Sequence, residues 1–133
     1  MSPAKRGTGT VADFGETAAR EYLVQHGYRI LGQNVQIGHE ELDLICETRE
    51  TRAFVEVKTR TMRPDGPHPW GTPSDAVTKS KRRHLLSCAR QYNLTHPTKK
   101  QTRMDIVEVY LEPRADSALT VLKIHHMEDA FGA

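Results

Sequence analysis

Residues 54–60, FVEVKTR, carry two charged side chains within a run that is otherwise typical of a buried β-strand. The aromatic and β-branched residues of this run favour strand structure. Glu56 and Lys58 interrupt them, and because side chains alternate along a strand, both project from the same face. By itself this E-x-K pattern is most often an ordinary solvated strand face, so its interpretation depends on what lies opposite Glu56.

The segment before this strand supplies an acidic partner. Residues 41–47, ELDLICE, alternate in polarity and are followed by the polar turn TRETR, which predicts an antiparallel hairpin with residues 53–59. With the turn centred between residues 49 and 50, Asp43 lies opposite Glu56. Directly opposed side chains lie roughly 5 Å apart, and two like charges there are destabilising. The repulsion must therefore be offset by a shared proton, a cationic side chain or a bound metal ion.

A metal ion is the alternative that fits all three charged residues. Carboxylate oxygens such as those of Asp43 and Glu56 are the ligands that Mg²⁺ or Mn²⁺ prefers. Such an ion polarises a phosphodiester and lowers the pKa of a bound water. Lys58 would then orient or deprotonate the attacking water, or stabilise charge on the phosphate. The competing interpretation is an ordinary solvated strand face, because E-x-K is common in strands. Glu41 is either a further ligand or a surface residue.

The rest of the chain predicts one α/β domain over residues 13–133, preceded by a flexible tail over residues 1–12. A first helix is expected from Asp13, which would cap it, to about His26, with Gly27 as the stop signal. The remaining expected elements are strands over 28–35, 41–47, 53–59, 104–111 and 119–126, a second helix from Ser74 or Asp75 to about Asn93, and a short helical turn over 127–131. Leu42 and Leu44 are expected to share one strand face. This order predicts a mixed central sheet of about five strands flanked by helices.

Charge is distributed unevenly along the chain, although the net charge is only +2. No Asp or Glu occurs between residues 76 and 104, whereas acidic residues crowd positions 40–56. A basic surface beside an acidic cluster suggests a polyanion and a cation as binding partners. The residues expected to contact nucleic-acid phosphates from the second helix are Lys79, Lys81, Arg82 and Arg83. A solvated helix face is the alternative interpretation of this charge run.

Other classes of protein are not favoured. No apolar run approaches the roughly 18 residues that a membrane span requires, so no membrane association is expected. The polar N-terminus lacks the apolar core of a signal peptide, and a cytoplasmic location is expected. The two cysteines, Cys46 and Cys88, have no zinc-binding spacing and are expected to be reduced.

Five motifs in order resemble the YraN-like family of uncharacterised bacterial proteins. They are GETAAREYL (15–23), ELDLI (41–45), FVEVKTR (54–60), AVTKSK (76–81) and RMDIVEVY (103–110). The match extends from Phe14 to Phe131. This family is similar in turn to Holliday-junction resolvases and other restriction-endonuclease-like PD-(D/E)xK nucleases. The resemblance therefore implies a restriction-endonuclease-like core, and symmetric junction-cutting relatives suggest a homodimer.

The resemblance also implies roles for individual residues. Asp43 and Glu56 would hold the divalent metal, Lys58 would be the catalytic lysine, and Glu16 would approach from the first helix to complete the site. Glu16 has an alternative explanation, because its spacing from Asp13 is that of a helix capping box.

Four further positions bear on the resemblance. Lys81 matches a lysine of the second-helix motif, and Arg103 with Asp105 matches an R-x-D motif, as structural support or phosphate contacts. The chain departs from the family at Glu40, where the family usually has glycine, and this departure concerns the local backbone geometry.

The leading hypothesis is a Mg²⁺-dependent endonuclease that hydrolyses phosphodiester bonds in DNA, including branched or structured DNA. The first alternative is a nucleic-acid-binding module that keeps the nuclease-like fold without turnover. The second is a protein-interaction domain that uses the proline-rich loop around Trp70.

Overall fold

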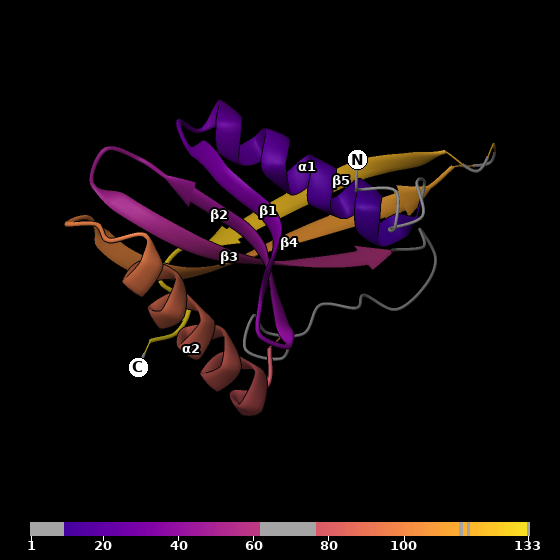
Figure 1. Cartoon of the computed structure of the whole chain (residues 1–133). Coiled ribbons are helices and arrows are strands. Elements are labelled where there is room, and N and C mark those ends of the chain that lie inside the picture. The colour runs from indigo at the N-terminus through magenta and orange to yellow at the C-terminus, as the bar shows by residue number, and fades with distance from the viewer. Residues whose placement is uncertain (1–9, 62–76, 115, 117, 133) are drawn as a thin grey trace.

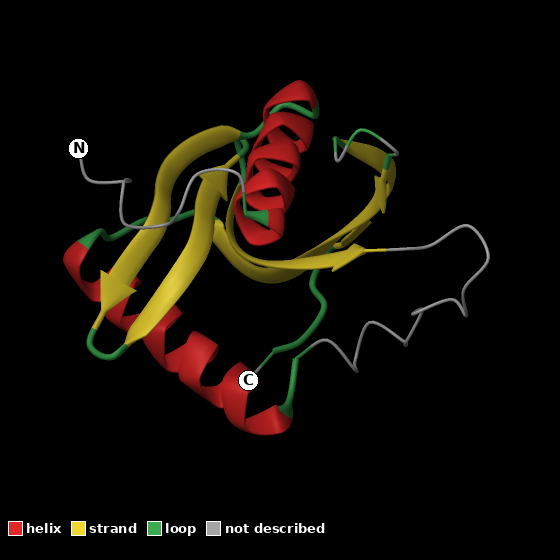
Figure 2. Ribbon diagram, turned by 90° about the vertical axis from the view of Figure 1, so that its right-hand side faces the viewer, coloured by secondary structure: helices red, strands yellow, loops and turns green. Residues whose placement is uncertain are grey.

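Five β-strands form one mixed sheet with a helix on each side (Figures 1 and 2). The computed structural model describes residues 10–61, 77–114, 116 and 118–132. In chain order the elements are α1 (Val11–Gln25), β1 (Arg29–Ile37), β2 (Glu40–Glu47), β3 (Thr51–Thr61), α2 (Lys79–Thr95), β4 (Gln101–Pro113) and β5 (Leu119–Met127). The strand order in the sheet is β1-β2-β3-β4-β5, and β3 pairs with β4 in parallel. The predicted α/β class and mixed five-stranded sheet are confirmed.

The hairpin of β2 and β3 has the register that its sequence predicts. Its pairs run from Glu47 with Arg52 to Leu44 with Val55. One further step brings Asp43 opposite Glu56, where backbone pairing has already ended. The hairpin therefore ends where its two acidic residues meet.

The separation of β2 from β3 changes the direction of Leu42. Leu44 packs in the core on the α1 side, whereas Leu42 packs with Ile45 in the core on the α2 side. The prediction that Leu42 and Leu44 share a face is wrong. Leu42 keeps its regular pairing with Val35 of β1, but it lies beyond the last residue of β2 that pairs with β3. A two-stranded ribbon twists more strongly than a wider sheet, so this part of β2 turns Leu42 toward α2.

The two core clusters show which side of the sheet each β3 side chain faces. Val55 and Val57 pack with Leu23 of α1 in one cluster, while Phe54 belongs to the cluster that includes α2. Figure 1 shows α1 above the sheet and α2 below it. By alternation, Glu56 projects from the face opposite α1.

The helix boundaries differ in part from those predicted. α1 begins at Val11 because Thr10 caps it, with the Thr10 hydroxyl accepting a hydrogen bond from the Asp13 backbone N–H at 3.0 Å. The predicted Asp13 cap is therefore wrong. Gly27 follows the helix with φ +92°, a left-handed conformation that favours glycine, as a stop signal requires.

The second helix is shorter at its start than predicted. Its cap is Thr78, whose hydroxyl accepts a hydrogen bond from the Lys81 backbone N–H at 3.1 Å. The predicted start at Ser74 or Asp75 lies outside the described residues, as does Trp70. At the other end the helix continues to Thr95, two residues beyond the predicted end at Asn93.

The segment after β5 is a turn and not the predicted helical turn. The Ala130 N–H donates to the Met104 carbonyl at 2.7 Å, and the Asp129 N–H donates to the Asp105 carboxylate at 3.0 Å. These N–H groups bond to β4 instead of to a preceding helical turn. Phe131, which follows them, is buried in the core on the α2 side.

Neither described helix has the length and apolar character needed to cross a lipid bilayer.

α1 approaches β3 closely at Gly15. A Cβ added there would lie 1.9 Å from Thr59 Oγ1 and 2.8 Å from Thr59 Cβ. We expect Gly15→Ala to lower the free energy of unfolding by about 2–3 kcal/mol, because the helix must move away from β3. Urea unfolding measures this change. Helix propensity alone predicts a gain of about 1 kcal/mol, so a stabilised variant would contradict the close contact. Thr59→Gly in the same chain should recover part of the loss.

Candidate functional site

Asp43 and Glu56 meet where β2 separates from β3. The Asp43 carboxylate accepts a hydrogen bond from the Val57 backbone N–H at 2.8 Å, in place of a regular ladder bond. The Asp43 and Glu56 carboxyl groups also hydrogen-bond to each other. Only 9% of the Glu56 surface is exposed. The structure thus brings together the two acidic residues that were predicted to converge.

Burial makes both carboxyl groups hold protons more tightly than usual. Burial, followed by the negative charge of Asp43, raises the pKa of Glu56 to about 7. Burial also raises the pKa of Asp43, against the lowering effect of the hydrogen bond from Val57. Two carboxyl groups that hydrogen-bond to each other share a proton readily, because both cannot ionise without cost. The pair therefore favours any cation that can replace that proton.

Two lysines lie beside the carboxyl pair, each from a different element. Lys58 projects from the same face of β3 as Glu56, and its positive charge acts against the rise in the Glu56 pKa. Lys81 lies in the first turn of α2, and its positive charge lowers the pKa values of Asp43 and Glu56. Burial lowers the pKa of Lys81, but the negative charges of Glu56, Glu40 and Asp43 outweigh it, so the net pKa is raised. Lys81 is therefore a charged member of the site, as well as a predicted phosphate contact.

Glu40 links β2 to the start of α2. Its carboxylate lies 3.3 Å from Lys81 Nζ and 3.6 Å from His84 Nδ1. The residues with positive φ are Asn34, Asp129, Gly27 and Gly38 within the described part of the chain, so Glu40 does not occupy a conformation that requires glycine. Glutamate at position 40, where the family usually has glycine, therefore leaves the backbone regular. Its carboxylate also forms an ion pair with Lys81.

Glu16 does not join the carboxyl pair. It is buried in α1, with 7% of its surface exposed, and α1 covers the face of β3 opposite Glu56. In residues 10–61, 77–114, 116 and 118–132, no three His, Cys, Asp or Glu side chains form a group that could hold a metal ion. The capping-box alternative does not apply either, because Thr10 is the cap and Glu16 lies in a later turn.

The predicted phosphate contacts on α2 gather at the N-terminal end of the helix. Lys79 and Arg83 are exposed, and Arg82 donates to the Val77 carbonyl at 3.0 Å and lies 5.9 Å from the centre of the Phe131 ring. No acidic residue occupies the first turn of α2. The positive end of the helix dipole adds to these charges. The electropositive end of α2 therefore lies near the carboxyl pair, on whose pKa values the charge of Lys81 acts.

Arg103 has a different environment from the other predicted phosphate contacts. Its guanidinium makes two hydrogen bonds of 2.9 Å to Asp105 and a further one to the Tyr28 hydroxyl. Asp105 is fully buried and also lies 2.8 Å from His126 Nε2. Of the two roles considered for the R-x-D motif, the structure favours structural support.

Glu108 is a buried acidic residue near the candidate site that was not predicted from the sequence. Glu108 lies in β4, has 1% of its surface exposed and pairs in register with Lys58. The sequence VEVY at 107–110 places a glutamate between valines, which is the same signal that drew attention to Glu56. Counting charged residues within strand-like runs would therefore have found Glu108.

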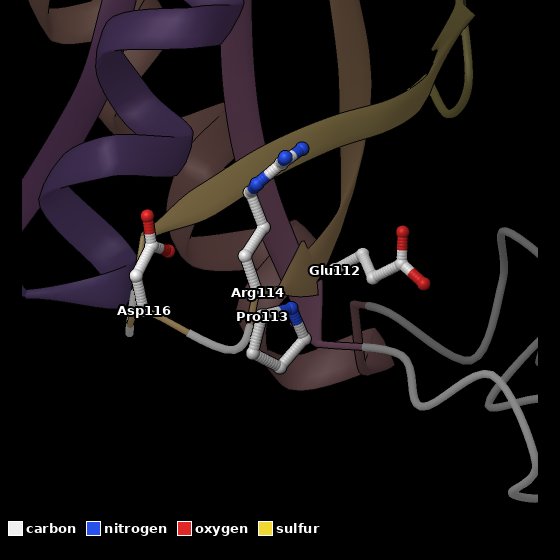
Figure 3. A pocket seen from close by; sticks show the side chains of 4 residues that line it. All are labelled: Glu112, Pro113, Arg114 and Asp116. Atoms are coloured by element: carbon white, nitrogen blue, oxygen red, sulfur yellow. The ribbon is translucent and has the colours of Figure 1, made fainter.

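Two surface hollows lie away from the carboxyl pair. One of about 440 Å³ lies at the turn after β4 and is lined by Glu112, Pro113, Arg114 and Asp116; Figure 3 shows their charged ends extending in different directions. The other, of about 260 Å³, lies between β1 and the last turns of α2, where Tyr92 and His96 contribute to its lining. None of the predicted site residues lines either hollow.

Comparison with known proteins identifies relatives across most of the chain. A family model described as "Uncharacterised protein family UPF0102" matches residues 15–109. The UPF0102 protein of Caldanaerobacter subterraneus subsp. tengcongensis is 39% identical over 123 residues, which cover 92% of this chain and 94% of that protein. The UPF0102 protein of Symbiobacterium thermophilum is 41% identical over 110 residues, 82% of this chain and 87% of that protein. Among solved structures, Pyrococcus furiosus SfsA in complex with Ca²⁺ matches with a TM-score of 0.38 and 15% identity, over 85% of this chain and 61% of that chain.

Proposed function

The chain belongs to the uncharacterised protein family UPF0102, and we propose that it is a divalent-metal-dependent endonuclease that hydrolyses phosphodiester bonds in DNA, branched or structured DNA included. One observation carries the proposal. The buried carboxyl group of Glu56 and the partly buried carboxyl group of Asp43 hydrogen-bond to each other, with Lys58 on the same strand face as Glu56. A structural role alone does not account for this pair, because its two like charges oppose folding.

The donor set suits Mg²⁺ or Mn²⁺. Asp43 and Glu56 offer hard oxygen ligands, and Mg²⁺ is commonly held by one or two carboxylates while it keeps several waters. The carboxyl groups already lie together, and a cation would replace their shared proton. When bound, the ion would polarise the phosphate and lower the pKa of a coordinated water.

The lysines beside the pair suit the remaining requirements of phosphodiester hydrolysis. Lys58 is partly exposed and forms no salt bridge with the described residues, so its ammonium group can interact with the attacking water or with the charge that grows on the phosphate. Lys79, Lys81 and Arg83, at the start of α2, would bind the phosphates on either side and hold the strand over the site.

The test is cleavage of single-stranded DNA, duplex DNA and a four-way DNA junction, with Mn²⁺ and with EDTA. We expect cleavage with Mn²⁺ only, and a rise in melting temperature with Mn²⁺ that Asp43→Asn removes, because a ligand that binds only the folded state stabilises it. Glu50→Gln, in the exposed turn between β2 and β3, removes one negative charge far from the pair and serves as the control. Failure of the native chain to cleave any of these substrates would overturn the proposal.

A second candidate function is nucleic-acid binding without turnover. It is favoured by the absence of a third metal-ligating side chain beside Asp43 and Glu56 among the residues the structure describes. In that case Asp43→Asn should leave DNA affinity unchanged or raise it, since a negative charge is removed, while Lys79→Gln with Arg83→Gln should weaken it. Cleavage lost in Asp43→Asn would exclude this alternative.

A further inference from the structure

A second polar cluster continues the candidate site along β3 and β4. Because these strands are parallel, Lys58 pairs with Glu108 and Arg60 pairs with Tyr110. Side chains at every second position share a face, so these four residues project from the same side of the sheet as Glu56. The C-terminal end of β3 extends past the N-terminal end of α2 in both ribbon views (Figures 1 and 2).

The contacts in this cluster centre on Glu108. The Tyr110 hydroxyl donates to Glu108 Oε1 at 2.8 Å, and Arg60 Nε donates to Glu108 Oε2 at 3.4 Å. His125 Nδ1 on β5 lies 3.7 Å from Oε1. Burial and the hydrogen bond to Glu108 raise the pKa of Tyr110 to about 12, so the hydroxyl keeps its proton and remains a donor. Both carboxylate oxygens of Glu108 therefore accept hydrogen bonds.

Glu108 contacts Arg60 and not Lys58, although Lys58 is its direct neighbour in the ladder. A buried carboxylate needs a positive partner, and Arg60 supplies it from the next position along the strand face. This arrangement leaves the ammonium group of Lys58 close to Glu56, whose pKa it affects. Lys58 and Arg60 thus act on different carboxylates, Glu56 and Glu108 respectively.

Arg60 has capacity for a further anion. Its side chain is 24% exposed, whereas that of Glu108 is 1% exposed, so the guanidinium extends from the buried carboxylate toward solvent. A guanidinium carries five N–H donors, and its contacts among the described residues are to Glu108 and to the Tyr110 hydroxyl. The remaining donors form a planar fork that matches a phosphate.

We propose that Arg60 binds a backbone phosphate of the nucleic-acid strand beside the carboxyl pair, and that Glu108 and Tyr110 are positioning residues that hold its guanidinium. Glu56 and Arg60 are four residues apart on one strand, which corresponds to about 13 Å. The inference rests on the proposed function for the identity of the ligand. It gives Arg60 a role in substrate binding. The proposed cleavage reaction does not depend on that role.

The experiment measures binding of a fluorescent duplex oligonucleotide and of a four-way DNA junction in EDTA, between about 50 and 200 mM salt. Arg60→Gln is expected to weaken binding about tenfold and to reduce the slope of log affinity against log salt by about one, as loss of one phosphate contact predicts. Arg49→Gln is the matched control, because Arg49 is exposed in the turn before β3, about 30 Å away along the strand. It should keep the native slope.

Because Arg60→Gln leaves the Glu108 carboxylate without its cation, the doubly substituted Arg60→Gln, Glu108→Gln chain restores the charge balance and should show the same loss of slope. Tyr110→Phe tests positioning. It should weaken binding two- to fivefold, roughly, when Arg60 is present and not at all when Arg60 is replaced, which a merely structural role would not produce.

The outcomes separate this inference from the proposed function. If the native chain binds DNA and Arg60→Gln lowers the salt slope, the inference holds even where no cleavage is found. If cleavage occurs but the slope of Arg60→Gln and of the charge-balanced chain equals that of native protein, the inference fails and the nuclease proposal stands. Absence of DNA binding by the native chain would overturn the inference.

Discussion

Glu56→Gln is expected to abolish cleavage and, at the same time, to make the metal-free protein more stable at about pH 8. Loss of a metal ligand should lower the cleavage rate by about 10²–10³-fold or more. The gain in stability follows because burial and the neighbouring Asp43 raise the pKa of Glu56 to about 7, so the folded state holds an ionised Glu56 at a cost. Glutamine has a similar shape and carries no charge.

The sign of the pH dependence follows from the same shift. The ordinary pKa of this carboxyl is 4.5, and the folded value is about 7. Between these pH values the folded chain binds a proton that the unfolded chain does not, so stability falls as the pH rises from about 4.5 to about 7. The difference corresponds to about 3 kcal/mol. In Glu56→Gln this loss should be absent.

Urea unfolding at about pH 5 and pH 8, without metal, measures the effect. Glu50→Gln, an exposed substitution of the same kind, should keep the native pH profile. Addition of Mn²⁺ should stabilise the native chain more at pH 8 than at pH 5, because the metal competes with the shared proton. A Glu56→Gln chain that is less stable than native at pH 8, or that keeps the Mn²⁺ response, would contradict the assignment of Glu56.

Asp105→Ala is expected to cost about 3–5 kcal/mol of unfolding free energy, the range for removing one partner of a buried ion pair. Asp105 is fully buried, and it accepts hydrogen bonds from Arg103, His126 and the Asp129 backbone. Burial raises its pKa, but the hydrogen bonds from His126 and Arg103 outweigh this and hold the pKa below its ordinary value. Its stabilising effect is thus present at neutral pH and is lost below about pH 4.

Urea unfolding of single and double variants checks this expectation. Asp105→Ala leaves the Arg103 guanidinium buried without its carboxylate, so Arg103→Met in the same chain should recover part of the loss. Glu50→Ala replaces an exposed acidic side chain in the turn between β2 and β3 and should change stability by less than about 0.5 kcal/mol. A loss for Asp105→Ala as small as this control would show that the network does not hold β4 and β5 together.

The two expectations have opposite signs for a physical reason. Asp105 is surrounded by donors and a guanidinium, whereas Glu56 faces a second carboxyl group. Both are buried, but only the first has its charge fully compensated within the chain. An uncompensated buried charge that opposes folding is typical of a functional position.

Local sequence patterns were sufficient for the hairpin of β2 and β3. The polar turn and the alternation fix the pairing of Leu44 with Val55, and this register carries Asp43 opposite Glu56. Turn length and period are properties of neighbouring residues, so they are readable without the rest of the chain. The mixed sheet with flanking helices follows in the same way from the order of the elements.

Contacts between segments that are distant in the sequence could not be predicted from local patterns. Lys81 and Glu40 are 41 residues apart, and only the packing of α2 against β2 brings them to 3.3 Å. Likewise, the sequence contains Glu108 and Arg60 but does not state that β4 lies parallel to β3 with these residues on one face.

By itself, then, the sequence determined the two acidic residues that face each other, the lysine beside them and the class of fold, because each depends on the alternation or spacing of nearby residues. Tertiary structure decided the placement of Glu16 on the other side of the sheet, the engagement of Arg103 in a buried network, and the contact of Glu108 with Arg60. Those outcomes depend on which helix covers which face and on which strands are neighbours. Long-range packing sets both.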